Sequence, residues 1–578
     1  MKHLTKHFKP YLVGLIALLF LVCGQSYVNL ILPDYTAKIV DQGIILKNIE
    51  IIWSEGFKML LFTILGGLLT IIVGFTAAKI STGYARRLRE AIFTKIESFS
   101  LNEFNTFSSS SLITRSTNDI QQIQNVLSMM LRMSLLAPFM GVGAIIKANQ
   151  LAPNMSWIVL TAVCILSTII IILFLFAIPK FTVIQKLVDR LGLQIREMLT
   201  GIRVIRAYND DKQQQKKFDE TNIKSTKLNI FINRIMAMMQ PAMTLIMGLS
   251  SVAVVWAGSY LVGSGHLQIG NVLALTQYVS QTIMAFLMIS IIFIMVPRAA
   301  VSGRRINEVL SVAPEIIDPK TSVHPSDKIR GLVEFNNVNF SYEGSEQPVL
   351  SNISFIARPG QTTAIIGGTG SGKSTILSLI PRLYDTKNGS ITIDGINIRN
   401  FSQHELRNNI GYVPQKASLF SGTIKSNISY GRPEASSEEI TKAATTAQAE
   451  EFINSLADGL DSYIAQAGNN ISGGQKQRLS IARALVKKPP IFLFDDSFSA
   501  LDFKTASTLK KALQKNLQDS TIIIVAQRIS TIMQADNIIV LDKGKIVAQG
   551  RHAELLVSSS VYREISESQL SAAELKKK

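Results

Sequence analysis

Nine consecutive residues in the second half of the chain have the composition of a phosphate-binding loop. They follow the β-branched run 362–366 and precede a predicted helix. In order, they are Gly367, Gly368, Thr369, Gly370, Ser371, Gly372, Lys373, Ser374 and Thr375. Glycines let backbone N–H groups converge on an anion, and the N-terminus of a helix adds partial positive charge. In this pattern the lysine reaches the outer phosphates of a nucleotide, and the serine coordinates Mg²⁺.

The first motif alone fits either a nucleotide-binding loop or an ordinary glycine-rich turn. A second glycine motif favours the nucleotide-binding loop. Ile471 is followed by Ser472, Gly473, Gly474 and Gln475. A helix is predicted from there to about residue 485, so its N-terminus and the two glycines form another anion site. The two motifs together predict a nucleotide-binding α/β domain, which begins near residue 331, where short β-rich runs start to alternate with helical stretches.

The first three hundred residues have a different character. The chain of 578 residues has 17% charged residues and a mean hydropathy of +0.26, which is high for a soluble protein. Six apolar stretches are predicted to span a membrane as helices, because most reach the roughly twenty residues that a bilayer requires. They cover residues 11–32, 59–78, 131–146, 156–178, 236–262 and 272–296.

Lysine and arginine are unevenly distributed between these stretches, which predicts the orientation of the chain. They are frequent in 79–115 and 180–217, and absent from the short connections 150–155 and 263–270. We therefore expect a multi-pass protein of the cytoplasmic membrane with both termini in the cytoplasm. The net charge of +18 is explained by cations beside anionic membrane lipid, so no nucleic-acid partner is predicted.

These motifs and spans resemble the ATP-binding cassette (ABC) transporter superfamily, in particular the bacterial exporters that fuse six spans to one nucleotide domain. The resemblance implies a membrane α-helical bundle of six transmembrane helices with long cytoplasmic extensions, and a C-terminal α/β P-loop ATPase domain. The expected divisions are a transmembrane domain at 1–312, a linker at 313–330, the ATP-binding domain at 331–570 and a charged tail at 571–578.

The resemblance also implies roles for single residues around ATP and Mg²⁺. Tyr342 corresponds to the aromatic residue that stacks on adenine, and Gln415 to the residue that contacts Mg²⁺ and links the site to the membrane helices. Asp495 ends an apolar strand and would hold Mg²⁺ with Ser374. Ser472 to Gln475 match the signature motif, which in this family faces the ATP of the opposite nucleotide domain. A second subunit is therefore expected.

Two positions depart from the family pattern. Asp496 stands where active members have the glutamate that polarises the attacking water, and Gln527 stands where they have the switch histidine. Glutamine cannot carry a charge or shuttle a proton. With Asp502 of the D-loop preserved, the pattern resembles the degenerate-site subunit of heterodimeric multidrug exporters. The alternative is a homodimer in which Asp496 acts as a weak base.

The sequence gives weaker indications for the regions that couple the two domains and for the transported molecule. Residues 106–120 and 197–208 resemble the two exporter coupling regions, and 466–470 lack the charges usual before the signature.

The predicted spans contain no acid or base near their centres, which favours hydrophobic small molecules as cargo. Five side chains of the sixth predicted span are expected either to line an adaptable apolar cavity or to face lipid and neighbouring helices. They are Met284, Phe286, Met288, Phe293 and Met295. Export of lipids, peptides or thiols, or a regulatory ATP-sensing role, remains an alternative.

Overall fold

The computed structural model describes residues 2–323 and 328–570. It divides into two compact units, one formed by Met1–Glu97 and Ser109–Val312, the other by Ser98–Ser108 and Ala313–Lys578. The predicted tail 571–578 and residues 324–327 of the predicted linker lie outside the described residues. Side chains outside the description are those of Lys2, His3, Leu173, Phe174, Ala177, Ile178, Phe181, Thr182, Phe293, Ile294 and Arg298.

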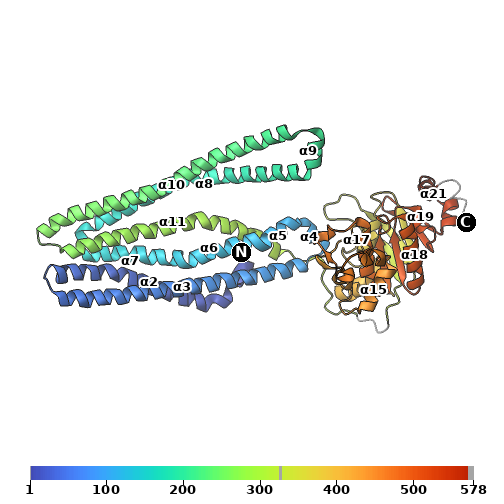
Figure 1. Cartoon of the computed structure of the whole chain (residues 1–578), viewed down its shortest axis with the longest axis horizontal. Coiled ribbons are helices and arrows are strands. Elements are labelled where there is room, and N and C mark those ends of the chain that lie inside the picture. The colour runs from blue at the N-terminus through green and yellow to red at the C-terminus, as the bar shows by residue number, and fades with distance from the viewer. Residues whose placement is uncertain (1, 324–327, 571–578) are drawn as a thin grey trace. The chain divides into compact units, whose positions relative to one another are not determined.

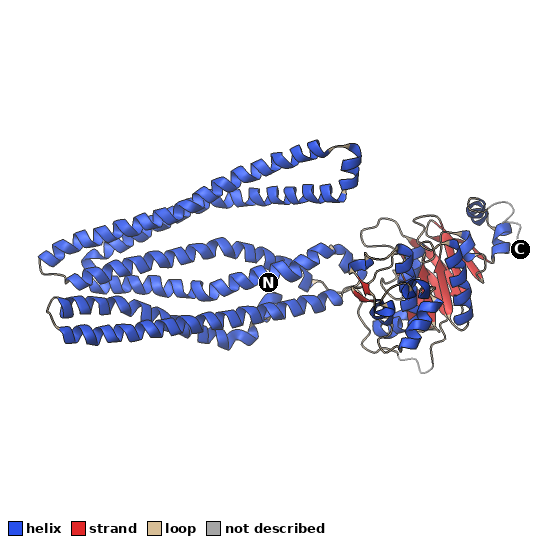
Figure 2. Cartoon of the chain, viewed as in Figure 1, coloured by secondary structure: helices blue, strands red, loops and turns tan. Residues whose placement is uncertain are grey.

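The first unit is entirely helical in its described part (Figure 2). Its α-helices are α1 (Lys2–Lys6), α2 (Leu12–Lys38), α3 (Ile49–Glu97), α5 (Ser109–Thr114), α6 (Ile120–Met129), α7 (Leu135–Leu151), α8 (Ser156–Thr200), α9 (Ile202–Tyr208), α10 (Asp211–Gly263) and α11 (Ile269–Ser311). Six stretches are long and apolar enough to cross a membrane, which confirms the six predicted spans. The third of them joins α5, α6 and α7 through two π-helical turns, Arg115–Asp119 and Met130–Ser134.

Three short connections gather at one end of this unit. They join α2 to α3, α7 to α8 and α10 to α11 (Figure 1), and we call this the turn end. Helices α8 and α10 lie side by side and diverge from the other helices toward α9, the short helix that connects them (Figure 1). Val204 and Tyr208 of α9 are exposed.

A polar cluster joins three helices near the turn end. The Lys147 ammonium of α7 lies 2.6 Å from an Asp34 carboxylate oxygen of α2. The buried Tyr278 of α11 donates its hydroxyl to the other Asp34 oxygen at 2.6 Å. Asp41 accepts a hydrogen bond from the Gly270 N–H at the start of α11. No local pattern predicts Asp34 or Lys147, because both lie just beyond the predicted apolar stretches and the helices continue past them.

The second unit contains a six-stranded sheet in the order β12-β11-β3-β10-β9-β6, with β12 as its one antiparallel strand. A four-stranded antiparallel sheet has the order β2-β1-β4-β5, and β7 pairs with β8. The strands are β1 (Val333–Phe340), β2 (Leu350–Ala357), β3 (Thr362–Gly367), β4 (Asn388–Ile393), β5 (Ile396–Asn397), β6 (Ile410–Val413), β7 (Gly422–Thr423), β8 (Tyr463–Ile464), β9 (Ile491–Asp495), β10 (Thr521–Val525), β11 (Asn537–Asp542) and β12 (Lys545–Gly550).

Helices cover both faces of the six-stranded sheet. They are α12 (Lys373–Leu379), α13 (Gln403–Asn408), α14 (Ile424–Ser429), α15 (Ser437–Thr446), α16 (Glu450–Asn454), α17 (Gly473–Val486), α18 (Phe503–Asn516), α19 (Ile529–Ile532), α20 (His552–Ser558) and α21 (Ser560–Glu567). Successive strand residues point to opposite faces. Ile522 and Ile524 therefore join the core beneath α17 and α18, whereas Ile523 joins the core shared with β1, β2 and α12. The predicted fold class is confirmed.

The short helix α4 (Leu101–Thr106) belongs to this second unit although it lies between α3 and α5 in the sequence. Leu101 packs against the core that contains β1. Asn105 donates to the Tyr384 hydroxyl, and Glu103 accepts from the Glu315 N–H at 2.8 Å. The helix thus precedes most of segment 106–120, which is predicted to be the first coupling region.

Replacing Lys147 with Met is expected to lower the thermal unfolding temperature of the purified protein. The change leaves the half-buried Asp34 carboxylate without its counter-ion, at a cost of about 1–3 kcal/mol. The double variant Asp34→Asn/Lys147→Met should recover part of the loss. Lys47→Met removes an exposed lysine from the turn between α2 and α3 and serves as the control. Equal unfolding temperatures for Lys147→Met and the control would contradict a stabilising pair.

Candidate functional site

The candidate phosphate loop connects the end of β3 to the start of α12. Gly370 and Gly372 have φ angles of +79° and +97°, which favour glycine. A Cβ atom at Gly372 would lie 2.6 Å from Leu350 Cδ2, and one at Gly367 would lie 2.0 Å from the Leu541 carbonyl oxygen. The glycines therefore allow a tightly wound loop of the kind that presents backbone N–H groups to an anion.

Lys373 folds back over this loop. Its ammonium donates to the carbonyl oxygens of Gly367 at 2.9 Å and Gly368 at 2.7 Å. Burial lowers the pKa of Lys373, while the nearby Asp496 and Asp495 carboxylates raise it. The Ser371 hydroxyl is buried and has no hydrogen-bond partner among the residues that the structure describes. A phosphate group would supply both the missing acceptor for Ser371 and a counter-charge for Lys373, so the loop fits a nucleotide's phosphates.

Two carboxylates lie at the end of β9, at the same edge of the sheet: Asp495 is its last residue and Asp496 follows it. Ser374 donates its hydroxyl to Asp495 Oδ1 at 2.7 Å. Burial raises the pKa of Asp495, which the Ser374 hydrogen bond partly opposes. Gln415 lies with its amide nitrogen 3.5 Å from Asp496 Oδ2. The oxygens of Ser374, Asp495 and Gln415 suit Mg²⁺, which binds through one or two carboxylates together with substrate phosphates.

Asp496 has a backbone conformation that is uncommon for residues other than glycine. Its φ angle is +45°, in the left-handed region, and its side chain is buried. The Asp496 N–H donates to the Val525 carbonyl oxygen of β10 at 2.9 Å. The backbone at this position is therefore tied to the adjacent strand. This limits how far the short aspartate side chain can reach toward a bound nucleotide.

Tyr342 lies beside the start of α12. Its hydroxyl is 3.0 Å from Thr375 Oγ1, and its ring meets Phe340 and Tyr384 edge-on. The side chain is partly exposed. The structure thus places the predicted adenine-stacking residue next to the phosphate loop, with its ring held by two other aromatic rings.

The predicted signature residues form the N-terminus of α17. Ser472 and Gln475 cap the helix reciprocally: Ser472 Oγ accepts from the Gln475 N–H, and Gln475 Oε1 accepts from the Ser472 N–H. Ser472 and Gly473 are exposed. A Cβ atom at Gly474 would lie 3.3 Å from the Ala500 carbonyl oxygen. The signature therefore adjoins the D-loop, where Asp502 caps α18 and its pKa is lowered by hydrogen bonds from Thr505.

The switch segment begins at Gln527, whose side chain is exposed. Its backbone is held by Gln569, which follows α21. The Gln569 amide donates to the Gln527 carbonyl oxygen at 2.8 Å and accepts from the Ile529 N–H at 2.9 Å. Sequence reasoning missed Gln569, because a glutamine forty-two residues downstream carries no pattern that points to this loop.

The parallel strands β3, β9 and β10 bring these groups together. Val525 at the end of β10 pairs with Ile365 of β3 and with Asp495 of β9. Carboxyl ends of parallel strands meet at one edge of a sheet, where ligands of such folds bind. The structure thus places Lys373, Ser374, Asp495, Asp496 and Gln415 at one site, in which the lysine and the two aspartates are buried and Ser374 and Gln415 are exposed.

Comparisons with known proteins agree with this arrangement. A family model described as "ABC transporter" matches residues 350–499, and one described as "ABC transporter transmembrane region" matches residues 12–286. The chain is 39% identical over 571 residues to an "uncharacterized ABC transporter ATP-binding protein" of Mycobacterium tuberculosis, covering 98% of this chain and 97% of the relative.

A further relative and a solved structure extend the comparison. A "fatty acid ABC transporter ATP-binding/permease protein" of Mycobacterium bovis is 32% identical over 480 residues, which cover 83% of this chain and 75% of that protein. The solved structure of a bacterial Atm1-family ABC exporter with ATP bound superposes with a TM-score of 0.79 at 25% identity, covering 96% of this chain and 98% of that one.

Replacing Gln569 with Ala is expected to accelerate hydrogen exchange of the Ile529 amide about fivefold. One hydrogen bond contributes roughly 1 kcal/mol to closing such a segment. The matched variant Gln569→Glu keeps an acceptor for Ile529 and should leave that amide close to the wild-type rate. Exchange measured by mass spectrometry at 529 should separate the variants, and an unchanged rate in Gln569→Ala would contradict the role assigned to this side chain.

Proposed function

The chain belongs to the ABC transporter family, and from this premise we propose that it is one subunit of a heterodimeric exporter. In this proposal, ATP drives hydrophobic or amphipathic small molecules across the cytoplasmic membrane by alternating access. The observation that carries the proposal is an assembled nucleotide site in which both positions expected to act in hydrolysis, Asp496 and Gln527, depart from the family pattern.

The proposed roles follow the geometry of the second unit. The loop 367–372 and Lys373 bind the outer phosphates of ATP, and Tyr342 contacts the adenine. Ser374, Asp495 and Gln415 hold Mg²⁺, which when bound neutralises negative charge on the β- and γ-phosphates. The site is thereby proposed to bind ATP well.

Turnover at this site is proposed to be slow. Asp496 is one methylene shorter than glutamate, and its backbone is tied to β10. A displacement of about 1 Å in a catalytic group can cost about a hundredfold in rate. Gln527 can donate a hydrogen bond to a phosphate but carries no charge.

The signature motif supports pairing with a different subunit. Its residues cap their own helix and leave an exposed N-terminus, which suits an anion brought by another nucleotide domain. A homodimer would contain two altered sites. A heterodimer can combine one altered site with one active site that this signature completes.

The orientation of the proposed subunit follows from its basic residues. Lysine and arginine are abundant in 180–217 around α9 and absent from the turn 264–268. The positive-inside tendency then places α9, both termini and the second unit in the cytoplasm, and the turn end outside.

Two features support uncharged, hydrophobic cargo. Asp34 and Lys147 neutralise each other inside the first unit. Met284 of α11 is exposed and Phe286 and Met288 are partly exposed, and flexible thioethers suit an adaptable apolar surface. The side chain of Phe293 lies outside the described residues. A second candidate cargo, a fatty acid, is favoured by the similarity to a relative that is named as a fatty acid transporter.

Ser472→Ala in this chain is expected to lower the ATPase rate of the co-purified complex more than Asp496→Asn does. The first change damages the site completed on the partner, and the second affects a site that already turns over slowly. Lys373→Ala should weaken nucleotide binding to this chain. Equal effects of the first two changes, or a brisk ATPase from this chain paired only with itself, would contradict the asymmetry.

Vesicles containing the complex are expected to transport an uncharged or cationic amphiphilic dye when ATP is present, and not with a non-hydrolysable analogue. A fluorescent fatty acid is assayed in parallel. Transport of the dye alone supports the first candidate cargo, and transport of the fatty acid alone supports the second. Transport of neither, with ATPase intact, would contradict both.

A further inference from the structure

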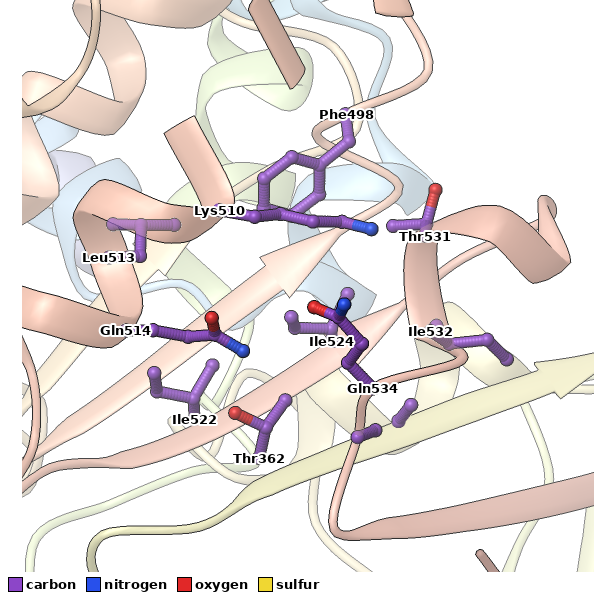
Figure 3. A pocket seen from close by; sticks show the side chains of 12 residues that line it. Thr362, Phe498, Lys510, Leu513, Gln514, Ile522, Ile524, Thr531, Ile532 and Gln534 are labelled. Carbon is purple, nitrogen blue, oxygen red and sulfur yellow. The ribbon is translucent and has the colours of Figure 1, made fainter. Parts of the chain in front are cut away.

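A small cavity opens on the face of the six-stranded sheet that α18 and α19 cover (Figure 3). Its volume is about 40 Å³. Its apolar floor includes Ile522 and Ile524 of β10 and Leu513 of α18. Because one water needs about 10–15 Å³, the space suits a molecule of about three to four non-hydrogen atoms.

One cation lines this cavity. The Lys510 ammonium of α18 donates to the Ser530 carbonyl oxygen of α19 at 2.7 Å. Among the described residues no carboxylate lies within ion-pair distance of it, and no other titratable side chain lines the cavity. Burial lowers the pKa of Lys510 to about 8. A partly buried ammonium without a counter-ion is costly, and an anion in the cavity would offset that cost.

Uncharged polar groups surround the ammonium. The side chains of Gln514, Gln534 and Thr531 border the same space, and Figure 3 shows the two amide groups and the Lys510 ammonium converging on it. None of these three polar groups makes a hydrogen bond within the described part of the protein. The cavity thus offers an ammonium, two amides and a hydroxyl above an apolar floor.

This combination of groups favours one chemical class of ligand. Carboxylate oxygens accept charge-assisted hydrogen bonds from ammonium groups and further bonds from amides. A short alkyl group can occupy the apolar floor, which a bare inorganic anion would leave unfilled. A carboxylate of two carbons matches both the chemistry and the volume.

The cavity also borders the elements that lead to the candidate nucleotide site. Thr362 and Ala364 belong to β3, which ends in the phosphate loop, and β10 leads to Gln527. Asp502 of the D-loop caps the N-terminus of helix α18. We propose that this cavity is a binding site for a small monocarboxylate, whose occupancy stiffens the switch segment by completing the contacts of Lys510 between α18 and α19.

Binding is tested with acetate on the full-length protein in lipid nanodiscs, by saturation-transfer NMR on the acetate methyl protons. Lys510→Met should weaken binding at least tenfold. Lys511→Met removes an exposed neighbouring lysine of the same helix and should leave binding unchanged. The cavity-filling variant Ala535→Val keeps Lys510 and should also abolish the signal, which preserves the test if Lys510→Met fails to fold.

The pH dependence gives a second readout. Acetate remains anionic above pH 7, whereas Lys510 loses its proton as the pH rises through about 8. Affinity should therefore fall about tenfold between pH 7 and pH 9. Acetate should also slow exchange of the amides in 529–532 in the wild type and not in Lys510→Met.

Several outcomes would overturn the proposal. These are absence of saturation transfer in the wild type, an undiminished signal in Lys510→Met, or affinity that does not change with pH. Equal displacement of acetate by chloride at constant ionic strength would mean that the site holds an adventitious ion only. ATPase activity is not needed for any of these readouts, so they are independent of the proposed heterodimer.

Discussion

The parallel pairing of β3, β10 and β9 is the constraint on which the candidate nucleotide site depends. It brings a buried lysine and two buried carboxylates, Asp495 and Asp496, to one edge of the sheet. Each of these charges would be costly to bury alone. Together with the Ser374 hydroxyl they compensate one another, and the glycine loop beside them can present backbone N–H groups to a further anion. The site is therefore preorganised for phosphate before any ligand arrives.

The same scaffold explains how the two altered positions can coexist with an intact framework. Asp496 is placed by a backbone hydrogen bond to β10, and the segment after Gln527 is held by Gln569 and Lys510. Neither arrangement depends on the chemistry of the residue at 496 or 527. In the proposed function, exchanging those side chains alters the reaction that the site supports and leaves nucleotide binding and the exposed signature helix in place. This separation is the physical basis for proposing an asymmetric pair of subunits.

The helical unit is held together differently. Its apolar stretches satisfy their backbone hydrogen bonds internally, which allows them to lie in lipid. Specific polar contacts then fix the helices near the turn end, where Asp34, Lys147 and Tyr278 join α2, α7 and α11. A compensated pair of this kind sets helix positions without adding net charge to the helical unit.

The sequence by itself determined the two kinds of unit, the six spans and the order of the nucleotide motifs, because these rest on local properties: runs of apolar residues, glycine spacing and strand composition. Only the tertiary structure showed that Asp34 meets Lys147, that α4 packs within the second unit, and that Gln569 and Lys510 hold the switch segment. Such contacts join residues far apart in the chain. They depend on helix length, strand register and side-chain packing, which no local pattern encodes.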